Sequence, residues 1–143
     1  MRFLKYLIVF IVIVGFFAFL SRENEPAFQK IKIGETIISV ELADDSPKQT
    51  RGLSGKDKLK ENNGMLFIYD KPEIRSIWMK DMKFPIDIIW VDENKKIIGV
   101  ENGVKPESYP KSFESPGPVK YILETNSGFA EKYGLKPGAL VDF

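Results

Sequence analysis

The sequence predicts a mainly β protein: a compact single-domain sandwich or barrel of about eight short strands and two short helices, preceded by one N-terminal transmembrane helix. Three observations lead to this prediction. Short apolar segments recur after residue 28, and turn residues separate them, which is typical of all-β folds. Residues that commonly cap the start of a helix precede only two short segments after residue 28. The first 20 residues contain one long apolar run.

Residues 1–27 are expected to be a membrane anchor and a tether. Arg2 and Lys5 precede an uncharged run over residues 6–20, and an apolar helix of about 18 residues is roughly 27 Å long, just enough to span. The best cleavage frame puts the bulky Leu20 at the scissile position, so an uncleaved anchor is favoured over a signal peptide. Because basic residues precede the run, the rest of the chain is expected outside the cytoplasm, single-pass and membrane-bound, or secreted or periplasmic if the leader is cleaved.

Residues 28–143 are expected to form one domain, because about 115 residues suit a single core. Arg2 and Lys5 lie in the leader, so residues 21–143, the part expected to be exported, carry 19 of the 21 basic residues and 20 acidic ones. A net charge of −1 does not suit a nucleic-acid partner, so none is predicted.

The chain contains neither histidine nor cysteine. This excludes serine-histidine and cysteine-histidine nucleophile systems, and zinc, haem and iron-sulfur sites with their usual ligands. No metal site and no cofactor is predicted. Any catalysis would have to use carboxylates, Lys, Arg, Tyr, Ser or Thr.

The first half of the domain is expected to contain a hairpin, a helix and a strand. The segments FQKIKI and TIISVEL flank Gly34 and Glu35 and predict the hairpin. Asp45 or Ser46 before Pro47 predicts a capped helix that runs to about residue 53. The NNG turn at residues 62–64 then starts the strand MLFIY.

The second half is expected to contain strands over residues 74–79 and 86–91 and over the segments KIIGVENGV, VKYILE and ALVDF. The segment KPESYPKSFESPGP has four prolines and no apolar periodicity, so it is predicted to be a long loop. Asn126 and Ser127 are expected to cap a short helix, GFAEKY, that ends at Gly134.

Charged residues interrupt the apolar segment RSIWMKDMKFPIDIIWVD, residues 75–92. Asp87 follows Pro85 in a strand that is apolar on both faces, so its carboxylate either reaches the rim or is buried with a partner. If the two strands of this segment are antiparallel neighbours, a basic side chain of the first would reach Asp87. Either an ion pair or capping contact holds this hairpin, or Lys80, Asp81 and Asp87 line the mouth of a pocket.

A few further side chains suit ligand binding. Arg51, with Thr50, would offer hydrogen-bond donors to a ligand carboxylate or phosphate, although a structural salt bridge is the default for such an arginine. Tyr109 and Phe113 on the proline-rich loop suit recognition of sugars or peptides, or else plug the end of the barrel. The predicted ligand-binding residues are Arg51, Trp78, Lys80, Asp81, Asp87, Tyr109 and Phe113.

The ordered blocks TRGLSG, GMLFIY, RSIWMKDMKFPIDIIWVD, VKYILETNSGFAEKYG and LKPGALV, over about residues 36–143, resemble the family known as domain of unknown function 192 (DUF192). The family commonly has WMKN-T-x-x-P-L-D, which Trp78, Lys80, Pro85 and Asp87 match, whereas Asp81 and Met82 replace its asparagine and threonine. The resemblance implies a small, mostly β domain that often follows an export signal. It implies no established activity, substrate or catalytic residue.

Together these features favour a membrane-tethered extracytoplasmic domain that binds a small ligand or an envelope protein without catalysis. One alternative is a carboxylate-dependent hydrolase of the envelope, which requires two acidic groups in one cleft. Asp81, Asp87, Asp92, Glu101 and Glu124 are its candidates. The other alternative is a scaffold of an envelope assembly, which predicts an exposed apolar patch and no cavity.

Overall fold

The computed structural model describes residues 28–143. The predicted anchor and tether, residues 1–27, lie outside the described residues. Within residues 28–143, none of the helices is long and apolar enough to cross a bilayer.

This part of the chain folds into nine strands and two short α-helices. The strands are β1 (Phe28–Ile33), β2 (Thr36–Ala43), β3 (Asn63–Glu73), β4 (Ser76–Trp78), β5 (Ile86–Val91), β6 (Ile97–Val104), β7 (Ser112–Glu114), β8 (Val119–Asn126) and β9 (Val141–Asp142). The helices are α2 (Ser46–Arg51), α3 (Phe129–Lys132) and one 3-10 turn, η1 (Pro106–Ser108). The predicted mainly β domain with two short helices is thus confirmed.

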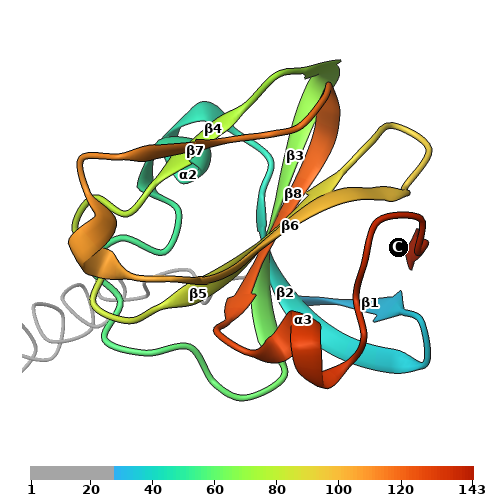
Figure 1. Ribbon diagram of the computed structural model, residues 1–143, viewed down its shortest axis with the longest axis horizontal. Coiled ribbons are helices and arrows are strands. Elements are labelled where there is room, and N and C mark those ends of the chain that lie inside the picture. The colour runs from blue at the N-terminus through green and yellow to red at the C-terminus, as the bar shows by residue number, and fades with distance from the viewer. Residues whose placement is uncertain (1–27) are drawn as a thin grey trace, which may run out of the picture.

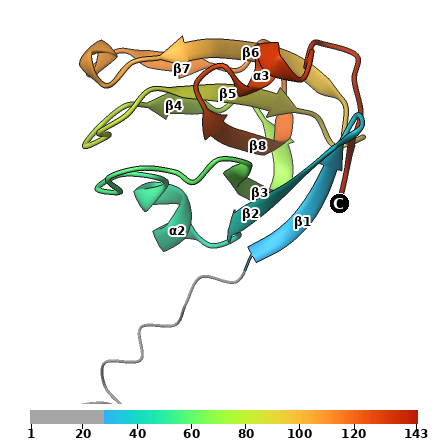
Figure 2. The same ribbon diagram turned by 90° about the horizontal axis from the view of Figure 1, so that it is seen from below.

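Seven of the strands form one sheet in the order β6-β5-β8-β3-β2-β1-β9. It curls from β6 and β5 through β8 and β3 to β2 and β1 (Figure 2), so it is a half barrel and not two stacked sheets. One isolated bridge connects its two outer ends, where Ile97 N donates to Ala139 O at 2.9 Å and Val141 N donates to Lys95 O at 2.9 Å. The segment before β9 therefore ties the start of β6 to the opposite end of the sheet.

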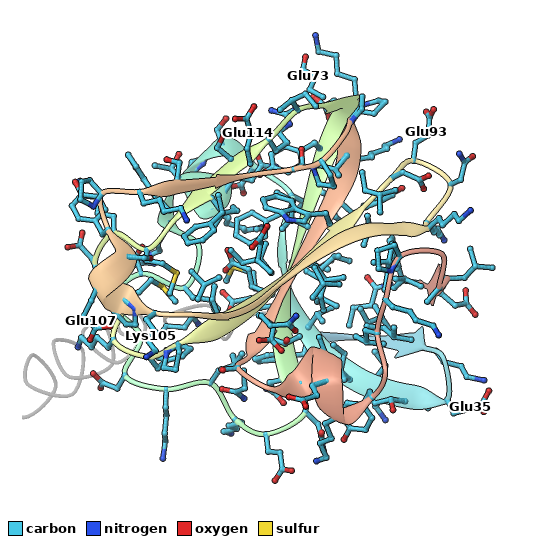
Figure 3. The ribbon with its side chains drawn as sticks, viewed as in Figure 1. Glu35, Glu73, Glu93, Lys105, Glu107 and Glu114 are labelled. Carbon is cyan, nitrogen blue, oxygen red and sulfur yellow. The ribbon has the colours of Figure 1, made fainter. Side chains whose placement is uncertain are left out.

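The remaining two strands, β4 and β7, form a separate antiparallel ribbon. The ribbon and α2 lie at one end of the molecule, and α3 and the β1–β2 hairpin lie on the opposite side (Figure 1). Side chains fill the space between the ribbon and the sheet (Figure 3).

Each face of the sheet has its own apolar core, because successive side chains on a strand point to opposite faces. On one face, Leu66, Ile89 and Leu123 pack with β1, β2 and α3. On the other, Phe67, Trp90 and their neighbours pack against the β4–β7 ribbon and the segment after α2. The second core contains the cavity described below.

One local prediction about this arrangement was wrong, and the condition considered for residues 75–92 is not met. The strand after Arg75 is not a neighbour of β5, because β4 pairs with β7, within the segment predicted to be a loop. That segment was misjudged because Ser112–Glu114 is too short, and too polar on either side of Phe113, to show a period. Arg75 consequently reaches Glu73, at 2.9 Å, and lies over the Tyr69 ring.

The helix ends were predicted with mixed success. Asp45 caps α2 as expected, accepting a hydrogen bond from Lys48 N at 2.8 Å. The first turn of α3 has no side-chain cap from Asn126 or Ser127. Its amide Ala130 N instead donates to a carboxylate from β5, described below.

Candidate functional site

A cavity of about 250 Å³ lies between α2, the β4–β7 ribbon and the sheet. Its walls come from the end of α2 and the turn after it, from β3, from β4 and from the start of β5. The lining residues are Gln49, Thr50, Arg51, Gly52, Leu53, Ser54, Phe67, Tyr69, Ser76, Ile77, Trp78, Met82, Ile86 and Glu124. Polar and charged side chains make up about half of this lining, and apolar and aromatic side chains make up most of the rest, a mixture that suits a small polar ligand.

Glu124 of β8 is the only carboxylate among these lining residues. Its side chain is 4% exposed, and its neighbours across the sheet are Met65 of β3 and Ile88 of β5, both apolar. Within residues 28–143 its carboxylate has neither a hydrogen-bond partner nor an ion-pair partner. Burial therefore raises its pKa from 4.5 to about 8, because nothing nearby compensates for the lost hydration of the charged form.

Charged carboxylates elsewhere in the domain have a different environment. Glu35, Glu73, Glu93, Glu107 and Glu114 point outward at the periphery of the molecule (Figure 3). Solvent there stabilises the charged form, which it cannot do for a group beneath α2. A buried, unpartnered acid facing a cavity is a common mark of a functional site.

Gly52 allows the chain to leave α2 directly above Glu124. It has φ +53° and ψ −136°, a conformation that is nearly restricted to glycine, and its N–H closes the helix on Lys48 O at 2.8 Å. A Cβ at this position would lie 3.3 Å from the Phe67 ring and 4.0 Å from Glu124 Oε2. The absent side chain thus leaves room at the floor of the cavity.

We expect Gly52→Ala to destabilise the domain by roughly 2–3 kcal/mol, because it combines a strained φ with contact against the Phe67 ring. Gly34→Ala is the matched control: it has φ +57° but nothing within 4 Å of the added Cβ, so roughly 1 kcal/mol is expected. Urea unfolding of both variants measures the difference. Equal losses would show that the close approach of Gly52 to the cavity floor has no energetic consequence.

The rim of the cavity carries positive charge and aromatic surface. Arg51 is exposed and, within residues 28–143, has no ion pair, so the default structural salt bridge is not observed. Trp78 is 51% exposed; Tyr109 packs edge-on against it with ring centroids 6.2 Å apart. Lys80 Nζ lies 5.8 Å from the centre of the Trp78 ring. Arg51, Trp78, Lys80 and Tyr109, all among the predicted ligand-binding residues, therefore lie at or beside the rim.

The structure places the other predicted residues away from the cavity lining. Asp81 is exposed in the turn after β4, with φ +57°, and its carbonyl accepts from Gly55 N. Phe113 is half-buried and packs into the core beneath the ribbon, beside Ile77. Of the two aromatics on the proline-rich segment, Phe113 fills the interior, and Tyr109 remains exposed.

Asp87 is fully buried on the opposite face of the sheet. Its Oδ1 accepts from Gly103 N at 2.8 Å and its Oδ2 from Ala130 N at 2.9 Å, so it ties β6 and the start of α3 to β5. It is thus buried with two backbone partners, which corresponds to the capping contact considered above. Arg75 does not reach it.

Sequence reasoning considered Glu124 only as one of several carboxylates and did not identify Phe67 or Tyr69. One signal was present: Glu124 shares a strand face with Ile122, within an otherwise apolar run. A carboxylate in that pattern must be buried, partnered or functional. The sequence pattern does not reveal the position of α2. This helix covers the Glu124 carboxylate and forms one wall of the cavity around it.

No group of three or more Asp or Glu residues in the described part of the chain is arranged to hold a metal ion. Several carboxylates of the domain form ion pairs with lysines or arginines. Asp44 and Asp45, for example, both pair with Lys48, at 2.7 and 3.3 Å.

Comparison with sequence families decides the relationship suggested by the ordered blocks. The sequence profile of DUF192, described as "Uncharacterized ACR", matches residues 29–143. The chain belongs to the DUF192 family. No curated protein matches the chain significantly.

Two solved structures are similar to this DUF192 protein. One is described as a "putative transcription regulator" from Sinorhizobium meliloti 1021, with a TM-score of 0.79 and 26% identity over 84% of this chain and 96% of that one. The other is a protein of unknown function from Novosphingobium aromaticivorans DSM 12444, with a TM-score of 0.77 and 26% identity over 85% and 94% of the two chains. Both share the fold.

Proposed function

We propose that this DUF192 protein is a membrane-anchored, extracytoplasmic binding module that holds a small ligand in the cavity beneath α2 and does not transform it. The observation that carries the proposal is Glu124, an acid that is buried, unpartnered and open only to that cavity. A fold that retains such a group incurs a free-energy cost unless a ligand uses it.

Binding is favoured over hydrolysis by the composition of the cavity. Carboxylate-dependent hydrolysis needs two acidic groups facing one bond, and Glu124 has no second carboxylate beside it among the lining residues. Asp87 lies on the other face of the sheet, and Asp81 is exposed in a turn outside the lining. The chain also has no histidine or cysteine to act with Glu124.

The proposed location rests on the apolar run at residues 6–20 and the basic residues before it. The full chain is expected in the membrane fraction, with its domain open to protease added outside the cytoplasm, and deletion of residues 1–20 is expected to release it. Nucleic-acid binding is not part of the proposal. Without the three basic and two acidic residues of the segment 1–27, 18 of each sign remain.

A covalent block of the cavity tests ligand binding directly. Because the chain has no cysteine, Ser76→Cys introduces a unique thiol on the cavity wall, where Ser76 is exposed. Small amines, acids, sugars and peptides are screened by saturation-transfer NMR against the full chain. We expect at least one class to bind, and its signal to disappear when a bulky methanethiosulfonate is attached at position 76.

Ser127→Cys is the matched control, since Ser127 is exposed in the turn before α3, away from the ribbon, and does not line the cavity. The same label there is expected to leave binding unchanged. Absence of binding by every class, or binding that survives the block at position 76, would contradict the proposed function.

A further inference from the structure

The charges around the cavity have a definite polarity. The single acid, Glu124, lies at the floor, and Arg51 lies in the wall at the end of α2. Lys80 adds a second positive charge beside Trp78 at the rim. A ligand that complements this arrangement is negative at its outer end and positive at its inner end.

The walls near the floor suit a cation. Phe67 and Tyr69 of β3 line the cavity together with Glu124, and an ammonium group is attracted both by a carboxylate and by aromatic faces. An anion would instead favour Arg51, the only cation among the lining residues. Arg75 already lies over the Tyr69 ring and pairs with Glu73, so within the described residues Glu124 and the Phe67 side chain remain for the cation of a ligand.

The rim suits an acid. Arg51 has no carboxylate partner within residues 28–143, and the guanidinium group binds carboxylates and phosphates through paired hydrogen bonds. The hydroxyl groups of Thr50 and Ser76 are further donors on the lining.

We propose that the ligand is a small zwitterion, an amino-acid-like molecule whose ammonium group binds Glu124 and whose acid group binds Arg51. This inference rests on the proposed function and names the chemical class that the cavity takes. The volume of about 250 Å³ admits a molecule of a few carbon atoms between the two charges.

Binding of such a ligand is coupled to loss of a proton. In the empty cavity the raised pKa of Glu124 keeps the carboxyl group protonated at neutral pH. An arriving ammonium group stabilises the carboxylate, so one proton leaves to solvent for each ligand bound below about pH 8. Affinity is therefore expected to fall about tenfold for each pH unit below 8 and to be flat above it, until the ligand amine itself loses its proton. The other charged or titratable groups in this region are Arg51 from α2, Tyr69 from β3, Arg75 over the Tyr69 ring and Lys80 beside Trp78.

The test uses isothermal titration of the full chain with glycine, β-alanine, γ-aminobutyrate and 6-aminohexanoate, which differ in the separation of their charges. Butylamine and butyrate each lack one charge of γ-aminobutyrate. We expect one length of zwitterion to bind at least tenfold more tightly than either single-charge compound, with butylamine above butyrate. Glu124→Gln is expected to remove the pH dependence and to reduce zwitterion affinity at pH 8 by at least tenfold. Arg51→Gln is expected to lower the affinity for the zwitterion to the affinity for butylamine.

The outcomes separate this inference from the proposed function. Suppose that a sugar or an acid binds, that the block at position 76 abolishes this binding, and that no amine binds. The inference of a zwitterionic ligand is then wrong, and the proposal of a binding module stands. If butyrate binds as tightly as the zwitterions, or if zwitterion affinity does not change between pH 6 and 8, the inference is also overturned. If no compound of any class enters the cavity, both fail.

Discussion

Replacing Glu124 by glutamine is expected to stabilise the empty domain at pH 9 and to leave its stability at pH 5 almost unchanged. In the folded protein the pKa of Glu124 is raised to about 8, whereas an unfolded glutamate titrates near 4.5. Between these values the folded state holds a proton that the unfolded state has lost, so the free energy of unfolding falls as pH rises. The loss is complete above about pH 8.

The size of the effect follows from the same two values. One pKa unit corresponds to about 1.4 kcal/mol, so the three units between pH 5 and pH 8 give roughly 4 kcal/mol. Glutamine is close in shape to the protonated acid and cannot ionise, so the variant is expected to keep at pH 9 the stability contribution that the wild type has near pH 5.

Urea unfolding of wild type and Glu124→Gln at pH 5, 7 and 9 measures this difference. Glu114→Gln is the control, because it makes the same chemical change at a carboxyl group that is exposed on β7 and not buried. If the free energies of unfolding of wild type and Glu124→Gln change in parallel from pH 5 to 9, the Glu124 carboxyl group is not desolvated. The argument that the cavity is a functional site would then fail.

Local sequence patterns predicted the elements of this fold better than their pairing. Turn residues and apolar runs gave the hairpin before Asp45 and the strand at residues 86–91, because these features depend on a few adjacent residues. The β4–β7 ribbon was missed because Ser112–Glu114 becomes a strand through its partner Ser76–Trp78, some 35 residues away, and not through its own composition.

The candidate site shows the same division between local and distant information. Arg51 at the end of α2 and Trp78 at the end of β4 could be identified from residue type alone, because an exposed arginine or tryptophan contributes little to the core. Glu124 could not be separated from the other carboxylates, because its importance depends on α2 covering it and on Met65 and Ile88 flanking it. Both facts come from contacts between segments that are far apart in sequence.

Replacing Asp87 by alanine is expected to destabilise the domain by on the order of 3 kcal/mol while leaving the cavity intact. The substitution leaves Ala130 N without a partner in the buried interior and Gly103 N without a partner in a part-buried position, and a buried unpaired donor costs about 1–3 kcal/mol. The loss falls on β6 and the first turn of α3, which Asp87 holds against β5 from the face opposite Glu124. Amide hydrogen exchange is therefore expected to accelerate at Gly103 and Ala130 more than across β3.

Asp92→Ala is a close control for Asp87→Ala. Asp92 Oδ1 also accepts from two backbone amides, Asn94 N and Lys96 N, both at 2.9 Å, but in a partly exposed turn where water replaces the lost acceptor. We expect its loss to cost about 1 kcal/mol or less. If the two variants lose equal stability in urea, burial of the amides is not what makes Asp87 important. If Asp87→Ala also abolishes binding in the cavity while remaining folded, the two faces of the sheet are coupled, and the purely structural role argued for Asp87 is wrong.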